Sequence, residues 1–151
     1  IFPYAQSILF SLGVNDISSG RTYNQVVASF EEALAHAEIH GLIIMVATIA
    51  PYTTSTDSWV TVANQTVVAG YESTGLRGQL NDYFRSLYAK KRIHALVDVD
   101  AVCADVIEKD KWKPNMTADG LHFNESCTIA IAESFKSLLL AVADKFESTV
   151  A

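Results

Sequence analysis

Three short segments of the chain are apolar at almost every position, so they lack the regular alternation of a strand with one exposed face. The segments are Ser7–Leu12, Leu42–Ile49 and Ala95–Val99. Strands have this composition when other elements cover both faces of a parallel sheet. The pattern therefore predicts three buried, parallel strands.

Apolar residues at helical spacing fill the segments between and after these strands. Thr22 and Gln25 have the spacing of a capping box, which predicts the start of the first helix. The periodic positions are Val27, Phe30, Leu34 and Ala37 in the first helix, Leu76, Leu80, Phe84 and Leu87 in the second, and Ile131, Phe135, Leu138, Val142 and Phe146 in the last. We also expect a weaker helix around Trp59–Ala69 and a polar surface loop over Pro51–Trp59.

The alternation of strands and helices predicts the fold class. It requires right-handed crossovers and puts helices on both faces of a parallel sheet. The 151 residues fit one domain, and no internal repeat or linker divides them. We therefore expect a single α/β domain over residues 1–151.

Polar residues gather just beyond the predicted strands, at the edge of the sheet where ligands bind in such folds. Asn15 and Asp16 follow the first strand, and Asp98 and Asp100 lie at the end of the third. The segment "MTADGLHFNES" then leads into the last helix. This edge is the expected position of a functional site.

Charge and hydropathy exclude two classes of partner. The formal net charge is −6, and the longest basic run is Lys90–Arg92, which argues against nucleic acid. The longest apolar run, Leu42–Ala50, is too short to cross a bilayer. We expect no nucleic-acid partner and no membrane span.

Metal and cofactor motifs are weak. Cys103 and Cys127 match no zinc or redox motif, so they form one disulfide or remain two buried thiols. His36 and His40 are four residues apart, but "HAEIH" lacks the glutamate position of the zincin motif. No glycine-rich loop joins a strand to a helix as in nucleotide binders. We predict no metal and no cofactor.

Two short stretches could carry acyl-transfer chemistry. Asp119 and His122 are three residues apart, so in a turn the carboxylate reaches imidazole Nδ1 and leaves Nε2 free as a general base. The alternative is a turn in which Asp119 caps the helix and His122 is merely exposed. The Asn15 amide, mounted at the end of a strand, can donate to an oxyanion, while Asp16 accepts backbone N–H bonds. The alternative there is an ordinary Asn-Asp turn.

Taken together, "SLGVND" and "ADGLHF" resemble blocks three and five of the SGNH hydrolases, the GDSL-type esterases and lipases, and "LIIMVATIAPY" resembles the strand and Pro turn between them. The resemblance implies a three-layer, flavodoxin-like parallel sheet and ester hydrolysis by a serine nucleophile, without a cofactor. It further implies that Asn15 donates to the oxyanion, that His122 is the base, that Asp119 orients His122, and that Gly13 forms the turn of block three. The implied substrate is a small ester, with an acetylated carbohydrate as our first choice and a short acyl lipid ester as the second.

The chain departs from that family at the nucleophile. It contains no Gly-Asp-Ser, which is the family's first block, and it lacks the glycine of the second block. The predicted sheet has three strands, whereas the family has five. Either the serine lies on an N-terminal segment outside this chain, or the domain has lost it, or a serine such as Ser18 or Ser19 replaces it.

We favour the first explanation because a sheet without its central strands would expose apolar surface. The expected partners are therefore the missing N-terminal segment and the ester substrate. The alternative function is an inactive SGNH-like module for binding or assembly.

Overall fold

The computed structural model describes residues 5–150, apart from the side chains of residues 137, 139 and 141–150. Its main sheet contains three parallel strands in the order β1-β2-β5. They are β1 (Ser7–Phe10), β2 (Ile43–Ala47) and β5 (Ala95–Val97). The three predicted parallel strands are confirmed, although each is shorter than its apolar segment.

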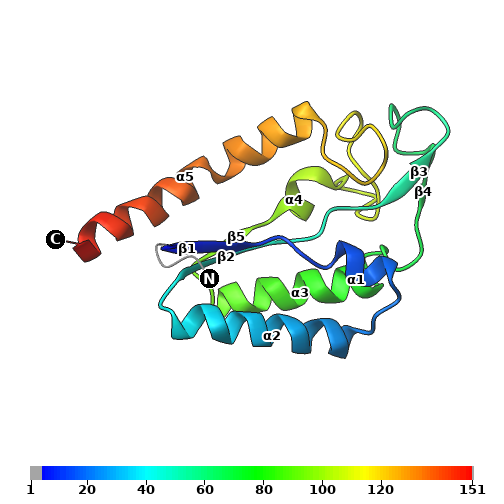
Figure 1. Ribbon diagram of the computed structural model, residues 1–151. Coiled ribbons are helices and arrows are strands. Elements are labelled where there is room, and N and C mark those ends of the chain that lie inside the picture. Colours follow the sequence, from blue (N-terminus) through cyan, green and yellow to red (C-terminus); the bar gives the residue numbers. More distant parts are fainter. Residues whose placement is uncertain (1–4, 151) are drawn as a thin grey trace.

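Helices cover both faces of this sheet, as Figure 1 shows. On one face lie α2 (Tyr23–Ile39) and α3 (Leu76–Ala89), and on the other lie α4 (Val99–Cys103) and α5 (Glu125–Val150). The short helix α1 (Val14–Ser18) directly follows β1. The predicted α/β class, with a parallel sheet between helices, is confirmed.

The predicted capping box opens α2. Thr22 Oγ1 accepts from Gln25 N, and Gln25 Oε1 accepts from Thr22 N at 2.9 Å. The buried valine of the first turns is Val26, whereas the predicted Val27 is only partly buried. Of the positions predicted for the last helix, Val142 and Phe146 have side chains outside the described ones.

The two faces of the sheet have cores of different size. Beneath α2 and α3, a large apolar cluster includes Phe10, Phe30, Leu34, Ile44, Leu80 and Phe84. The rings of Phe10 and Phe30 meet edge to face, with centroids 5.4 Å apart. Beneath α4 and α5 lies a smaller cluster of Ala47, Val99, Cys103, Trp112 and Cys127. Aromatic packing thus dominates one face, and a single buried tryptophan the other.

The segment after β2 differs from the prediction. Instead of a polar surface loop over Pro51–Trp59 and a helix over Trp59–Ala69, it forms an antiparallel pair of strands, β3 (Thr53–Ser55) and β4 (Gln65–Val67). Pro51 and Thr53 are fully buried. Both predictions were therefore wrong.

Buried hydrogen bonds explain this segment. Thr53 Oγ1 donates to Gln65 Oε1 at 3.1 Å, and Gln65 exchanges hydrogen bonds with the backbone of Trp112. At the tip, Asp57 Oδ2 accepts from both the N–H and the hydroxyl of Thr61. Polar side chains are buried here because they satisfy one another, a tertiary effect that hydropathy does not reveal.

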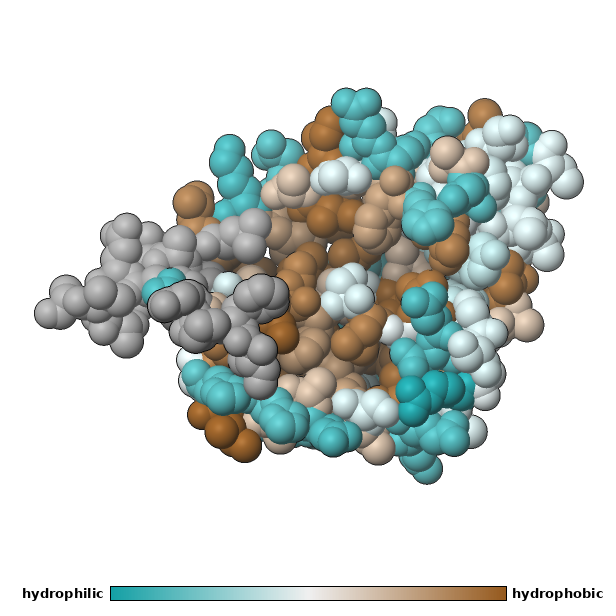
Figure 2. All heavy atoms as spheres, viewed as in Figure 1, coloured by the Kyte–Doolittle hydropathy of each residue, from teal (hydrophilic) through white to brown (hydrophobic). Residues whose placement is uncertain are grey.

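In the part of the chain that the structure describes, both edge strands of the main sheet, β1 and β5, are paired on one side only. β1 pairs with β2 on one side only, and Leu9 on β1 is 50% exposed. Figure 2 shows hydrophobic residues gathered across the middle of the face on which β1 lies in Figure 1. An unpaired strand edge with apolar neighbours is the usual place for another strand to add.

Candidate active site

Gly13 sets the position of Asn15. Gly13 adopts φ +110° at the start of α1, and a Cβ there would lie 2.5 Å from Ile49 Cδ1. Only glycine combines that backbone angle with so close an approach. The chain therefore turns sharply out of β1 and presents Asn15, with an exposed side chain, in the first turn of α1.

Two residues outside α1 hold this helix. Tyr71, which is fully buried, donates its hydroxyl to Val14 O at 2.8 Å and lies 3.0 Å from Ser18 Oγ. Burial raises the pKa of Tyr71, so the hydroxyl stays protonated and can donate. Asp16 accepts from Arg21 Nη1 at 2.9 Å. The sequence predicts that the Asp16 carboxylate accepts backbone N–H groups. Among the described contacts it forms this ion pair instead.

Asp119 and His122 lie in the loop before α5 and contact each other directly. Asp119 Oδ2 is 2.7 Å from His122 Nδ1, while Asp119 Oδ1 accepts the backbone N–H groups of Leu121 and His122 at 2.9 and 2.8 Å. These backbone and side-chain hydrogen bonds from His122, with that from Leu121, lower the pKa of Asp119. An ionised carboxylate only accepts, so Nδ1 carries the proton and Nε2 is the basic nitrogen.

The backbone around this pair is fixed by buried groups. Thr117 donates its hydroxyl to His122 O at 2.8 Å and accepts from Gly120 N at 2.9 Å. Gly120 adopts φ +81°, and its carbonyl accepts from Thr53 N and from the Trp112 indole. The loop is therefore docked on β3, although 77% of the His122 side chain and 54% of the Asp119 side chain remain exposed.

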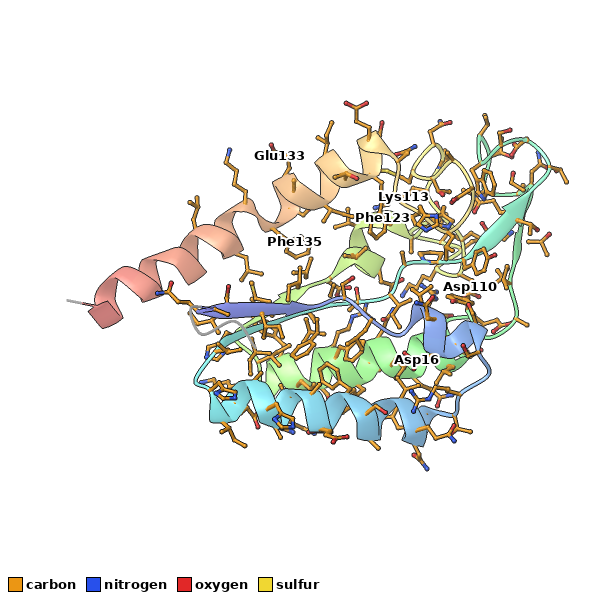
Figure 3. All side chains as sticks on the ribbon, viewed as in Figure 1. Asp16, Asp110, Lys113, Phe123, Glu133 and Phe135 are labelled. Atoms are coloured by element: carbon orange, nitrogen blue, oxygen red, sulfur yellow. The ribbon has the colours of Figure 1, made fainter. Side chains whose placement is uncertain are left out.

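A cleft of about 210 Å³ lies at the carboxyl ends of β1 and β2. Its walls are residues 11–16, residues 48–51, Leu121 and Phe123. Asn15 therefore shares a cleft with the two neighbours of His122, whereas His122 stands beside the lining. Figure 3 shows Asp16 and Phe123 at this same end of the sheet, on opposite sides of it.

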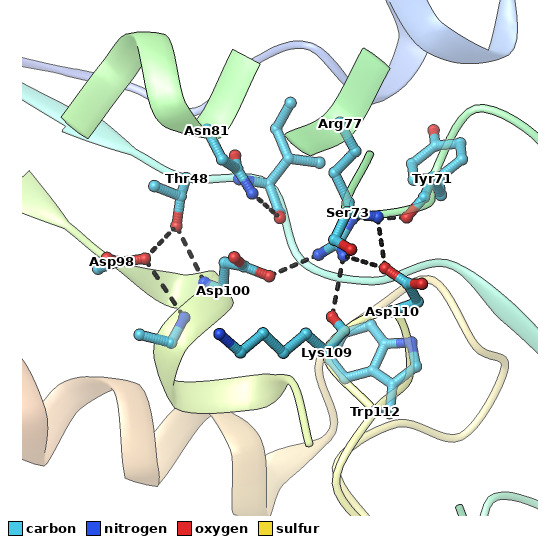
Figure 4. A network of polar contacts seen from close by, with 12 residues as sticks. Thr48, Tyr71, Ser73, Arg77, Asn81, Asp98, Asp100, Lys109, Asp110 and Trp112 are labelled. Atoms are coloured by element: carbon cyan, nitrogen blue, oxygen red, sulfur yellow. Dashed lines mark hydrogen bonds and ion pairs between the residues drawn. The ribbon is translucent and has the colours of Figure 1, made fainter. Parts of the chain in front are cut away.

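The wall formed by residues 48–51 is held from behind by α3. Asn81, which is fully buried, accepts from Ile49 N at 2.7 Å and donates to Ile49 O at 2.9 Å (Figure 4). Thr48 donates its hydroxyl to Asp98 Oδ1 at 3.0 Å. The Asn81 amide thus provides hydrogen-bond partners for the backbone N–H and C=O of Ile49, which lies just beyond the end of β2.

Asp98 and Asp100 belong to an ion network. Arg85 donates to both carboxylates, at 2.7 Å to Asp98 and 2.8 Å to Asp100. Buried Arg77 also donates to Asp100 (Figure 4). Burial raises the pKa of Asp98, but Arg85 and the hydrogen bonds from Ala101 and Thr48 together outweigh it, and the net shift is downward. Asp98 also caps α4 by accepting from Ala101 N. Asp98 and Asp100 therefore have structural roles. They lie at the sheet edge that the sequence predicts for them.

No described serine is hydrogen-bonded to His122. Ser11 lines the cleft, but the structure gives it no contact with His122. Ser18 donates to Tyr71 and so helps to hold α1. The described side chains therefore contain an oriented imidazole and an amide donor without a nucleophile beside them.

In the described part of the chain, no three His, Cys, Asp or Glu side chains come together as metal ligands. None of the helices there combines the length and apolar character needed to cross a bilayer.

Sequence reasoning did not find several residues of the site. Three of them, Trp112, Asn81 and Tyr71, have partners that lie elsewhere in the chain. The fourth, Thr117, bonds residues within the same loop. The Asp-Gly pair at 119–120 does signal a turn. A threonine two residues before it is a further local signal that could have been read.

Comparison with known proteins gives the fold. No family model and no curated protein matches the chain. Two solved structures are similar: a GDSL-like lipase from Bacteroides thetaiotaomicron VPI-5482 (TM-score 0.69, 11% identity) and a protein from Bacteroides fragilis NCTC 9343 assigned as an acylhydrolase (TM-score 0.68, 12% identity). The alignments cover 91% of this chain but only 63% and 62% of those chains. The chain thus has the fold of GDSL-like hydrolases and spans less than two thirds of these two relatives.

Proposed function

We propose that this chain is the C-terminal part of an SGNH-type ester hydrolase, with His122 as general base, Asp119 as its orienting carboxylate and Asn15 as an oxyanion donor. One observation carries the proposal. A single carboxylate accepts from His122 Nδ1 at 2.7 Å and also fixes the loop backbone, so Nε2 is the free, basic nitrogen. The residues on either side of His122, Leu121 and Phe123, line the cleft that Asn15 also lines. An imidazole oriented in this way is what acyl transfer through a serine requires.

In the proposed mechanism a serine hydroxyl attacks the acyl carbonyl as His122 Nε2 removes its proton. The Asp119 carboxylate stabilises the resulting imidazolium. The Asn15 amide donates to the oxyanion of the tetrahedral intermediate, and such a donor is worth about 3 kcal/mol of barrier stabilisation. His122 then protonates the leaving alcohol, and water hydrolyses the acyl-enzyme with His122 again as base.

The serine would come from a segment N-terminal to this chain. Two observations support this part of the proposal: β1 has an open edge bordered by exposed Leu9, and the two similar structures are longer than this chain. A strand added to β1 would end at the same sheet edge as Asn15, because parallel strands share their carboxyl ends.

The size of the cleft points to a small acyl group. A volume of about 210 Å³ has room for an acetyl or short acyl chain, and Phe123 and Leu121 give it an apolar wall opposite the polar Asn15. We favour an O-acetyl group on a carbohydrate, with a short acyl lipid ester second.

The test is turnover of p-nitrophenyl acetate by the protein that includes its upstream segment. His122→Ala should reduce kcat by at least about 1000-fold, and Asn15→Ala by about 100-fold. The control is His36→Ala, which removes an exposed histidine on α2 and should leave kcat unchanged. Equal activity of the wild type and His122→Ala would contradict the proposal.

The second candidate is an inactive SGNH-like module for binding or assembly. It is favoured by the absence of a serine beside His122 among the described side chains. In that case the protein with its upstream segment would turn over no ester, and Asp119→Asn and His122→Ala would be as inert as the wild type.

A further inference from the structure

Two cysteines meet in the core beneath α4 and α5. Cys103 is the last residue of α4, and Cys127 lies in the first turn of α5. Both side chains are completely buried, and their sulfurs are 2.6 Å apart. Ala47, Val99 and Trp112 enclose them in the smaller apolar cluster.

The other roles of paired thiols do not fit this position. A zinc site needs further ligands, and the described side chains form no group of three or more. A catalytic or sensor thiol must be accessible to its reaction partner. Neither the Cys103 sulfur nor the Cys127 sulfur reaches solvent, so neither thiol is placed for such a role.

We propose that Cys103 and Cys127 are joined by a disulfide bond in the mature protein. Two thiols lose two protons and two electrons as the sulfur–sulfur bond forms. A disulfide of glutathione or of a thiol oxidoreductase takes up both and is itself reduced to two thiols. Since both sulfurs are buried in the folded chain, the exchange takes place before α5 packs against α4.

The position of the bond gives it a consequence for the site. The two cysteines are 24 positions apart, and the loop they would close contains Thr117, Asp119 and His122. The crosslink would tie that loop to the end of α4, which directly follows β5. This inference concerns the covalent structure and stands whether or not the proposed ester hydrolysis is correct.

The test is a peptide map of the natural protein, with free thiols alkylated during lysis. Trypsin should release the Cys103 peptide, residues 93–109, and the Cys127 peptide, residues 112–136, because cleavage does not occur between Lys113 and Pro114. We expect one crosslinked species that separates into these two peptides only after reduction. Recovery of both peptides alkylated, without prior reduction, would overturn the proposal.

Thermal unfolding supplies a second measurement. The protein is unfolded in urea with dithiothreitol, so that the reductant reaches the bond, and is then refolded with dithiothreitol present. This reduction should lower Tm by about 10 °C, as expected when a loop of this length is opened. The Tm of the Cys103→Ser variant should not respond to dithiothreitol. A wild-type Tm equally unaffected by reductant would contradict the crosslink. If the variant does not fold, the peptide map of the wild type still decides.

Discussion

The loop that carries Asn15 and the loop that carries Asp119 and His122 lie at the same end of the sheet but are held in different ways. Asn15 lies in the first turn of α1. Gly13 and Ile17, two positions before and after it, are buried against the large apolar cluster. The Asp119–His122 loop is held by hydrogen bonds from Thr117 and by the docking of Gly120 on β3.

This difference indicates which part of the site depends on the core and which on local polar contacts. The backbone that carries Asn15 is positioned by packing and by one buried tyrosine hydroxyl. The imidazole of His122 is positioned by a carboxylate three residues away and is otherwise exposed. Substitutions should therefore affect the two loops separately.

The largest effect should come from Gly120→Ala. A Cβ at this position would lie 1.8 Å from the backbone oxygen of Thr53, at φ +81°. We expect the free energy of unfolding in urea to fall by more than about 3 kcal/mol.

The control for this change is Gly20→Ala. Gly20 has a similar φ of +71° but open space around it, so the variant should lose only about 1 kcal/mol. Equal losses in the two variants would mean that the contact between the loop and β3 contributes nothing.

An intermediate effect is expected for Tyr71→Phe, which removes the hydroxyl that donates to Val14 O. The partly buried Val14 carbonyl and the Ser18 hydroxyl each lose a hydrogen bond, so stability should fall by about 1 kcal/mol. Amide hydrogen exchange should accelerate in residues 14–18 and not in residues 117–123.

The matched control is Tyr88→Phe, on the exposed end of α3, which should change stability by less than about 0.5 kcal/mol. Faster exchange in both loops of the Tyr71→Phe variant would show that they are not held independently.

The smallest expected effect is on the loss of thermal stability at low pH in the Asp119→Asn variant. The pKa of Asp119 is lower in the folded chain than the value of about 3.9 in unfolded chains. The folded state then binds fewer protons, so this stabilisation is present above about pH 4 and is lost as the pH falls below it. Tm should decrease less steeply below pH 4 in Asp119→Asn than in the wild type.

The effect will be small because the side chain is more than half exposed. Asp82→Asn, which removes a carboxylate that is 82% exposed, should keep the acid response of the wild type. A steeper fall of Tm in Asp119→Asn than in the wild type would contradict the assignment.

The sequence predicted well those elements whose signal is local. Leu80 and Phe84 recur at helical spacing, and the apolar run around Ile44 has no alternation, so both could be placed from the sequence. The contact between Asp119 and His122 was also accessible, because the two residues are three apart and a turn brings them together.

The errors have tertiary causes. Thr53 and Gln65 resemble surface residues, but inside the fold they are hydrogen-bonded to each other, and Gln65 also bonds the backbone of Trp112. Asp16 was expected to accept backbone N–H groups, and instead it pairs with Arg21 in the turn that follows α1. Spacing along the chain does not reveal either arrangement.

Asp119 divides its two oxygens between two tasks, since Oδ1 holds the backbone of the loop and Oδ2 holds the imidazole. The shape of the turn and the tautomer of the histidine therefore depend on the same side chain. A redesign that moved the histidine elsewhere would have to rebuild the turn, and a graft of these few residues onto another scaffold would transfer both properties at once.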